Sequence, residues 1–353
     1  MIDYSIIIPS KNLPNLLERA LASIPRRDDF QVIVVDDASD PAIVDFDRYP
    51  GLDDPRVEVV FTTEGRGAGY ARNVGLERAA GRWTLFLDCD DFFTPDCLDL
   101  LDAHLDDPAD IVCFNITSAY SDDLSYSPRH LSRSEYFTRY DGPKREFCCR
   151  YLYTEPWGKM FRTSFLRPSP DTGATASKPS PAPAVNPALS RFRFDETPVA
   201  NDFKFSILTG LAAIRITTDA RPLCCITERH GSLSHDFCKT PEQLSTRLAV
   251  YSDVQSLLDA AGVKSYPFYK LVNFTLRHRR PLVPILRAFC NSSTASGGYT
   301  CIRPTASSTS SPTQPDSHVP DHFPGISYTR LRVKTFLLRI LFARYHRRHW
   351  AIF

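Results

Sequence analysis

Short, nearly continuous apolar runs rich in β-branched residues are the feature that most constrains how this chain can fold. Five such runs predict strands over Tyr4 to Ile8, Gln31 to Val35, Val57 to Thr62, Trp83 to Leu87 and Asp110 to Ile116. Strands that are apolar at successive positions are typical of a parallel sheet that is covered on both faces. The intervening segments predict helices over Asn15 to Ile24, Ala68 to Ala80 and Pro95 to His104, the last with Thr94 as its N-cap. The sequence therefore predicts an α/β fold with a mostly parallel central sheet and helices on both faces.

The bulk properties narrow the class of protein. A chain of 353 residues with 42% hydrophobic residues can bury a sizeable core, so we expect one main domain with a smaller appendage. A formal net charge of +1 provides no chain-wide basic field, which argues against general nucleic-acid binding. The ten cysteines show no CxxC pair with zinc spacing and are interpreted as core thiols in a reducing cytoplasm. No apolar run approaches the ~20 residues of a membrane span.

Polar residues follow the predicted strands at the point where each strand ends. Pro9 to Asn12 follow the first strand, Asp36 and Asp37 the second, and Asp88 to Asp91 the fourth. Ligands of open α/β sheets bind outside the carboxyl ends of the strands, so functional side chains are expected there.

The aspartate cluster after the fourth strand is the strongest chemical signal. Asp88, Asp90 and Asp91 place three carboxylates within four residues, and these repel one another unless a cation lies among them. Mg²⁺ or Mn²⁺ prefers hard oxygen ligands and leaves positions open for substrate phosphates. The cluster therefore predicts a divalent metal beside a diphosphate. The alternative is a set of solvated turn residues.

A glycine-rich segment from Glu64 to Gly75 leads into the second predicted helix. Glycines permit close backbone approach and helix N-termini attract phosphate, so a phosphate contact is one interpretation. The segment differs from the G-x-G-x-x-G dinucleotide motif, because Arg72 stands at the place of the third glycine. A flexible entry into the helix explains it equally well.

Four of these segments, in this order and spacing, resemble family 2 of the inverting glycosyltransferases. They are Ser5 to Pro9, Val32 to Ser39, Gly69 to Gly75 and Phe86 to Asp91. The resemblance implies a GT-A fold and transfer of a sugar from a nucleotide diphosphate, UDP above all, to an acceptor hydroxyl with inversion. It also implies a place in polysaccharide or glycolipid biosynthesis, with a sugar or lipid-linked acceptor. It is clear from residue 4 to about 120 and weaker to about 235.

The resemblance further implies roles for individual residues on the donor side. Pro9 and Asn12 would border the nucleobase, and Asp37 would bind its uracil-type edge with support from Asp36. Arg72 and Asn73 would lie near the nucleotide. The implied donor-binding residues are Pro9, Asn12, Asp36, Asp37, Arg72, Asn73, Asp88 and Asp90, and the implied metal ligands are Asp90 and Asp91.

The acceptor side follows from weaker likenesses. Trp157 and Lys159 match a W-x-K-x-x-R segment, although a lone Trp is more often core than a sugar platform. Arg229 and His230 belong to a basic loop that would close over the diphosphate. Asp202 matches the catalytic base, next to an Asn at a place often taken by Glu. Inverting transfer needs one base for the acceptor hydroxyl proton and no covalent nucleophile.

The resemblance and the composition together predict five segments. Residues 1–120 form the nucleotide-sugar-binding half, 121–240 the acceptor-side half with a disordered insertion at 167–190, 241–290 a helical extension, 291–327 a low-complexity linker and 328–353 a basic amphipathic tail.

The tail interleaves Arg and Lys with large apolar residues and contains no acidic residue. It can lie at an anionic membrane surface, which makes the expected location cytoplasmic and peripheral to the membrane, or it can pack back on the domain as a helix.

Two other functions stay open at this point. A sugar-nucleotide nucleotidyltransferase shares the α/β nucleotide-binding logic, but it is expected to carry a G-x-G-T-R-type loop where this chain has Pro9 to Asn12. A non-catalytic assembly partner would bind nucleotide sugar without turning it over, and the retention of Asp202 and the aspartate cluster argues against it.

Overall fold

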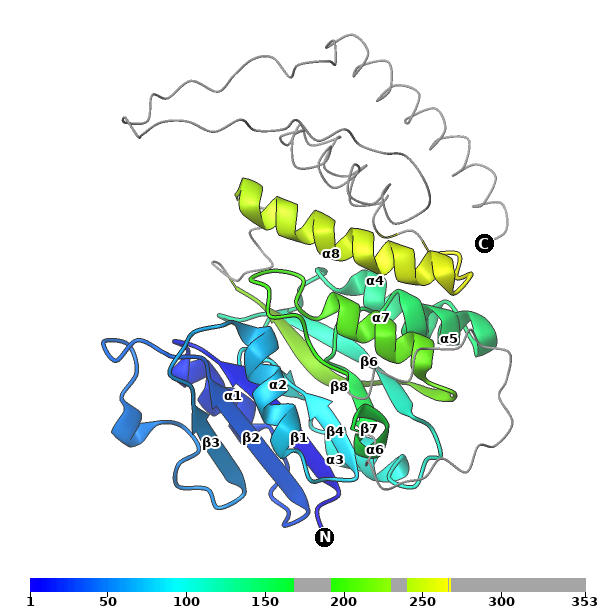
Figure 1. Ribbon diagram of the computed structural model, residues 1–353. Coiled ribbons are helices and arrows are strands. Elements are labelled where there is room, and N and C mark those ends of the chain that lie inside the picture. The colour runs from blue at the N-terminus through cyan, green and yellow to red at the C-terminus, as the bar shows by residue number, and fades with distance from the viewer. Residues whose placement is uncertain (168–191, 230–239, 266, 268–353) are drawn as a thin grey trace, which may run out of the picture. The chain divides into compact units, whose positions relative to one another are not determined.

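The computed structural model describes residues 1–167, 192–229, 240–265 and 267, and these contain one eight-stranded sheet. The strands are β1 (Tyr4–Ser10), β2 (Phe30–Asp36), β3 (Val57–Phe61), β4 (Trp83–Phe86), β5 (Phe92–Phe93), β6 (Ile111–Tyr120), β7 (Lys159–Arg162) and β8 (Ile216–Glu228). Their order across the sheet is β3-β2-β1-β4-β7-β6-β8-β5 (Figure 1). The five predicted strands correspond to β1, β2, β3, β4 and β6, with small shifts at their ends.

The parallel character of the sheet is concentrated in its first half. Strands β3, β2, β1 and β4 are mutually parallel, with Ile7 of β1 opposite Ile33 of β2 and Phe86 of β4. Strand β7 is antiparallel to both of its neighbours, β4 and β6, and β5 is antiparallel to β8, while β6 and β8 are parallel. The parallel pairs need crossover connections, and these supply the helices that cover both faces.

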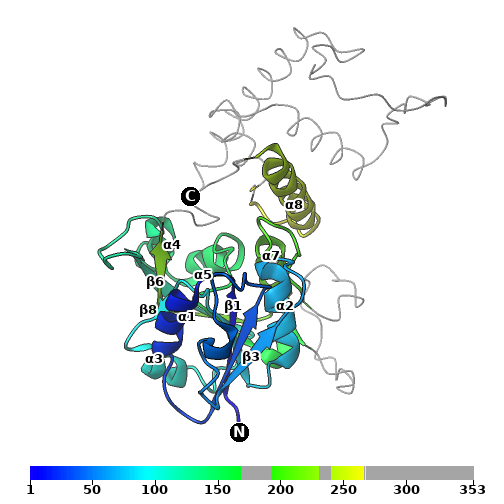
Figure 2. The same cartoon turned by 90° about the vertical axis from the view of Figure 1, so that its left-hand side faces the viewer.

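The helices follow the connections. They are α1 (Pro14–Ala22), the 3-10 turn η1 (Phe46–Arg48), α2 (Ala68–Arg78), α3 (Cys97–Ala103), α4 (Leu131–Thr138), α5 (Gly142–Tyr151), α6 (Thr163–Leu166), α7 (Phe203–Ala212) and α8 (Pro241–Ala260). Seen along the sheet from its β3 edge, α1 and α3 lie on one face of the β1–β3 region and α2 on the other (Figure 2). The predicted α/β fold is confirmed.

The predicted start of the third helix is wrong. Helix α3 begins at Cys97 with Asp96 at the N-cap position, so Thr94 is not its cap. The Thr94 hydroxyl instead donates to the main-chain oxygen of Pro222 at 2.8 Å, because Phe92 and Phe93 form the edge strand β5 against β8. The pairing with a strand distant in sequence outweighs the local capping preference.

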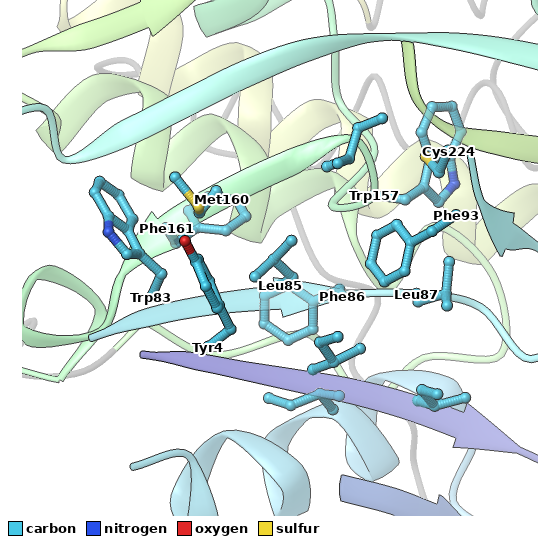
Figure 3. Close-up of a cluster of buried hydrophobic side chains, with 14 of the residues drawn as sticks. Tyr4, Trp83, Leu85, Phe86, Leu87, Phe93, Trp157, Met160, Phe161 and Cys224 are labelled. Carbon is cyan, nitrogen blue, oxygen red and sulfur yellow. The ribbon is translucent and has the colours of Figure 1, made fainter. Parts of the chain in front are cut away.

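The core lies between the sheet and its helices. Tyr4, Trp83, Phe86, Met160 and Phe161 are buried together where β1, β4 and β7 meet (Figure 3).

The segment that resumes at residue 192 is anchored in the same core. Phe194 stacks on Phe205 of α7 at 3.9 Å between ring centroids, and both rings meet Phe86 edge-on. Burial of aromatic rings of this kind contributes a large share of the hydrophobic stabilisation.

Helix α8 packs on α7 through a second apolar cluster. Its members are Phe203, Ile207, Val250, Val254 and Leu258, and the ring of Phe203 lies 4.2 Å from that of Tyr251. Helix α8 occupies the start of the segment 241–290 that is predicted to be helical. His230, most of the insertion 167–190, the linker 291–327 and the tail 328–353 lie outside the described residues. Within the described part of the chain, no helix combines the length and apolar character needed to cross a membrane.

Candidate active site

The aspartates after β4 converge. Carboxylate oxygens of Asp88, Asp90 and Asp91 all lie within 4.8 Å of one another. Asp91 is buried, and its Oδ1 accepts a 2.7 Å hydrogen bond from the Thr227 amide. Burial and the neighbouring carboxylates raise the pKa of Asp90 and bring that of Asp91 well above its ordinary value. These carboxylates offer hard oxygen ligands, and their negative charges repel one another. Such a set fits a divalent cation, whose positive charge would offset the repulsion.

Two arginines approach the same cluster. Nη2 of Arg72 lies 2.6 Å from Oδ1 of Asp88, and Nε of Arg229 lies 3.2 Å from Oδ2 of Asp90. Arg229 directly follows β8, so the basic loop predicted to face the diphosphate begins beside the aspartates. The partner predicted with it, His230, lies outside the described residues.

The aspartates after β2 organise the loops around them. Asp36 is buried and accepts hydrogen bonds from the Ser39 amide at 2.8 Å and the Tyr49 hydroxyl at 2.9 Å. Asp37 accepts 2.9 Å bonds from the amides of Arg66 and Gly67. Asp37 thus holds the glycine-rich segment against the strand end, and a nucleobase would use the lone pairs that remain. Its contact with the base stays a prediction.

Residues after β1 join the first two strand ends. Asn12 has a positive φ of 58°, and its main-chain amide donates to the Ser39 hydroxyl at 2.8 Å. Its Oδ1 accepts from the Asp40 amide at 2.7 Å. Pro9 lies within β1 opposite Val35. The strand ends expected to border the nucleobase are therefore adjacent.

The segment that leads to Asp202 crosses helix α2. The Asn73 side chain donates to the Phe194 carbonyl at 3.0 Å and accepts from its amide at 2.9 Å. A β-carbon on Gly69 would lie 2.1 Å from the carbonyl oxygen of Asp195. The glycine at this position makes room for the crossing chain, and Asn73 positions that chain. The glycine-rich pattern therefore has a packing cause in addition to any phosphate contact.

Arg72 links the crossing segment to the aspartate cluster. Its Nη1 donates to Oδ1 of Asn201 at 2.9 Å while its Nη2 binds Asp88. The guanidinium is buried and lies 5.4 Å from the Phe194 ring. One side chain thus ties the donor-side turn to the residue next to Asp202.

Asp202 lies at the N-cap position of α7 and is partly exposed. Among the described residues its carboxylate makes no capping hydrogen bond to the helix. Burial of the carboxylate raises the pKa of Asp202 to about 6. The negative charges of Glu155 and Asp88 also raise this pKa, whereas the positive charge of Arg72 lowers it. A half-buried carboxylate whose pKa is raised toward neutrality is compatible with the general base that the resemblance implies, and this role of Asp202 stays a prediction.

Trp157 and Lys159 point into the domain. Trp157 is 5% exposed and packs edge-on against His130 and Tyr153, with centroids 5.3 and 5.5 Å away. Lys159 is buried and donates to the main-chain oxygen of Tyr153, and its burial lowers its pKa. The enclosure of the indole favours the core alternative for Trp157, and the contact of either side chain with an acceptor stays a prediction.

The sequence patterns missed a half-buried ion pair whose carboxylate, Glu155, influences Asp202. Arg133 of α4 pairs with Glu155 through Nη2 at 2.6 Å and Nε at 3.2 Å. Glu155 is one of the groups that raise the pKa of Asp202. Glu155 belongs to the segment that contains Trp157, but Arg133 stands in no motif, so only the fold brings the pair together.

Parallel strands whose ends gather aspartates, joined to a mixed half of the sheet and to the segment that carries Asp202, are the arrangement of a GT-A type fold. Residues 5–167 match the family model for glycosyl transferase family 2, and we assign this part of the chain to that family.

Known proteins are similar in sequence to parts of this chain. The succinoglycan biosynthesis protein ExoO of Rhizobium meliloti is 36% identical over 101 residues, which are 27% of this chain and 28% of that protein. The poly(ribitol-phosphate) beta-N-acetylglucosaminyltransferase TarS of Staphylococcus aureus is 32% identical over 112 residues, 30% of this chain and 19% of that protein. The chain thus covers less than a third of either relative.

A crystal structure of Staphylococcus aureus TarS 1-349 in complex with UDP-GlcNAc is similar in fold. It has a TM-score of 0.52 and 20% sequence identity, and the match covers 78% of this chain and 72% of that one. At this identity the likeness concerns the fold.

Proposed function

We propose that this protein is a glycosyltransferase that moves a sugar from a UDP-type donor to an acceptor hydroxyl with inversion, assisted by a divalent metal. The observation that carries the proposal is the link through Arg72, which binds Asp88 of the aspartate cluster and Asn201 beside Asp202. With Asp88 on the diphosphate side and Asp202 as the base, this link would hold both groups in one site, which is what a single displacement requires.

The aspartate cluster would hold Mg²⁺ or Mn²⁺. Asp88, Asp90 and Asp91 offer the carboxylate oxygens, and their proximity to one another fits such an ion. When bound, the metal supplies positive charge that stabilises the leaving diphosphate.

The chain's own residues do the remaining chemistry. Above a pH of about 6 the Asp202 carboxylate is ionised and can take the proton of the acceptor hydroxyl. Arg229, beside Asp90, adds positive charge on the diphosphate side. No covalent intermediate is needed, and inversion at the anomeric carbon follows from one displacement.

The relatives support a donor and an acceptor class. TarS has been solved with UDP-GlcNAc, and the names of TarS and ExoO refer to polymer glycosylation or polysaccharide synthesis. We propose a UDP-sugar as donor and a polysaccharide or glycolipid precursor as acceptor.

A donor-turnover assay tests the function. The full chain is incubated with a panel of nucleotide sugars in Mg²⁺, in Mn²⁺ and in excess chelator, and release of the nucleoside diphosphate is measured. We expect turnover of at least one UDP-sugar that stops on chelation. Undiminished turnover in chelator would refute the metal requirement. Binding of the donors without turnover would favour the non-catalytic alternative, and release of pyrophosphate from a nucleoside triphosphate would favour the nucleotidyltransferase.

We also propose that residues 328–353 bring the enzyme to an anionic membrane surface, since this segment has basic and apolar residues but no acidic ones. The full chain and a chain ending at residue 327 are compared for sedimentation with phosphatidylglycerol vesicles. Loss of sedimentation on truncation, with turnover of soluble donor unchanged, is expected. Equal sedimentation of the two chains would favour the alternative in which the tail packs on the domain.

A further inference from the structure

Arg19 of helix α1 joins three strand ends that are distant in sequence. Its Nη2 donates to the main-chain oxygen of Asp90 at 2.6 Å, and its Nη1 donates to the main-chain oxygen of Ser121 at 3.1 Å. The Asp90 oxygen also accepts a 2.6 Å bond from the Thr227 hydroxyl. The turn after β4 is thereby tied to the ends of β6 and β8.

The surroundings fix the guanidinium in this place. Its central carbon lies 5.3 Å from the centroid of the Phe92 ring, a cation–π distance. Its Nε is buried and has no hydrogen-bond partner among the described residues. The amide of Ser121 donates to the Glu228 carbonyl at 2.8 Å, so the two strand ends that Arg19 and Thr227 connect are also bonded to each other.

The hydrogen bonds of Arg19 and Thr227 counteract the repulsion among the three aspartates. Three carboxylates within 4.8 Å repel one another and would open the turn that carries them. Two donors on the Asp90 carbonyl fix the peptide that leads into Asp91, and Thr227 fixes Asp91 itself through its amide.

We propose that Arg19 is a positioning residue for the metal-binding turn, which holds Asp90 and Asp91 in the arrangement that binds the divalent cation. The role rests on the proposed function, because it presumes that the aspartate cluster binds metal. Arg19 contacts main-chain atoms and acts through the carboxylates, so it is not itself a metal ligand or a catalytic group.

The test measures metal binding directly. Full-length protein is titrated with Mn²⁺ alone, and the free ion is followed by electron paramagnetic resonance. Removal of a group that orients metal ligands typically weakens binding by about 10- to 100-fold, and we expect a loss of this size for Arg19→Met. Arg19→Lys keeps the charge but has a single donor group, so it should recover part of the affinity.

Arg162 offers a matched control. Its guanidinium lies 4.4 Å from the Trp83 ring and its Nε donates to the Ala109 carbonyl at 3.1 Å, just before β6 and so at the opposite end of that strand. Arg162→Met loses comparable contacts without touching the turn. It should bind Mn²⁺ as the wild type does.

If its thermal melt shows that Arg19→Met does not fold, Thr227→Val tests the positioning role instead. It removes the second donor to the Asp90 carbonyl with almost no change of shape, and a smaller loss of Mn²⁺ affinity is expected. Wild-type affinity in the folded Arg19 and Thr227 variants would overturn the positioning role alone. A wild type that binds no Mn²⁺ would overturn the metal site and the positioning role together.

Discussion

The two halves of the site are built in different ways. On the donor side, Asp37 and Asp88 follow β2 and β4, which flank β1 in the parallel half of the sheet, so the topology alone brings them to one edge. On the base side, Asp202 is placed by a segment that crosses α2 through Asn73 and Arg72, and by the packing of α7 on α8. The donor half should therefore tolerate changes that disable the base half, and each half can be perturbed separately.

The largest expected effect comes from Asp202→Asn, which keeps shape and removes the proton acceptor. Loss of a general base typically lowers the rate by about 10²- to 10⁴-fold. UDP and Mn²⁺ affinity, measured by calorimetry, should stay near wild type, because the donor half is unchanged. Asp195→Asn, in the same crossing segment, is the control and should retain far more activity. Collapse of UDP affinity in Asp202→Asn would mean that Asp202 belongs to the donor site.

The substitution Leu258→Ala tests whether α8 belongs to the base half. Leu258 is fully buried in the cluster between α7 and α8, and a Leu→Ala change of this kind costs about 2–5 kcal/mol. Sugar transfer should fail on warming before UDP binding does. Leu17 of α1 is fully buried in the main core, and Leu17→Ala is the comparison, which should lower UDP binding as well. Simultaneous loss of both activities in both variants would show that the two halves unfold as one unit.

The pH profile should separate the halves as well. The pKa of Asp202 is raised to about 6, so the base is ionised above that pH and becomes protonated below it. With metal and donor saturating, kcat should fall about tenfold for each pH unit below the pKa of the base. UDP binding over the same range should change less. A rate that stays constant down to pH 4.5 would contradict the assignment of Asp202.

The smallest expected effect is that of Asn201→Ala. The change removes the 2.9 Å hydrogen bond from Arg72, and a bond of this kind contributes about 0.5–1.5 kcal/mol. A several-fold fall in kcat is expected, with UDP affinity retained because the pair between Arg72 and Asp88 remains. Steady-state kinetics and calorimetry together check it. A loss of UDP affinity larger than the loss of rate would place Asn201 on the donor side.

The sequence by itself determined the donor half. Apolar runs predicted β1, β2, β3, β4 and β6, because burial on both faces of a parallel sheet leaves a local, continuous pattern. The carboxylates of Asp88, Asp90 and Asp91 were expected to lie together because they are neighbours in one turn, and they do.

Only the tertiary structure decided the rest. Thr94 bonds to β8 and does not cap a helix, and the Trp157 side chain packs in the core. Gly69 leaves room for the chain at Asp195. Arg19 and Arg133 carry no motif, yet one holds the aspartate turn and the other pairs with Glu155 near the base. These contacts join segments that are distant in the chain, or depend on which way a side chain faces in the assembled core. Their energies come from packing and hydrogen bonds that exist only after folding, so no local pattern records them.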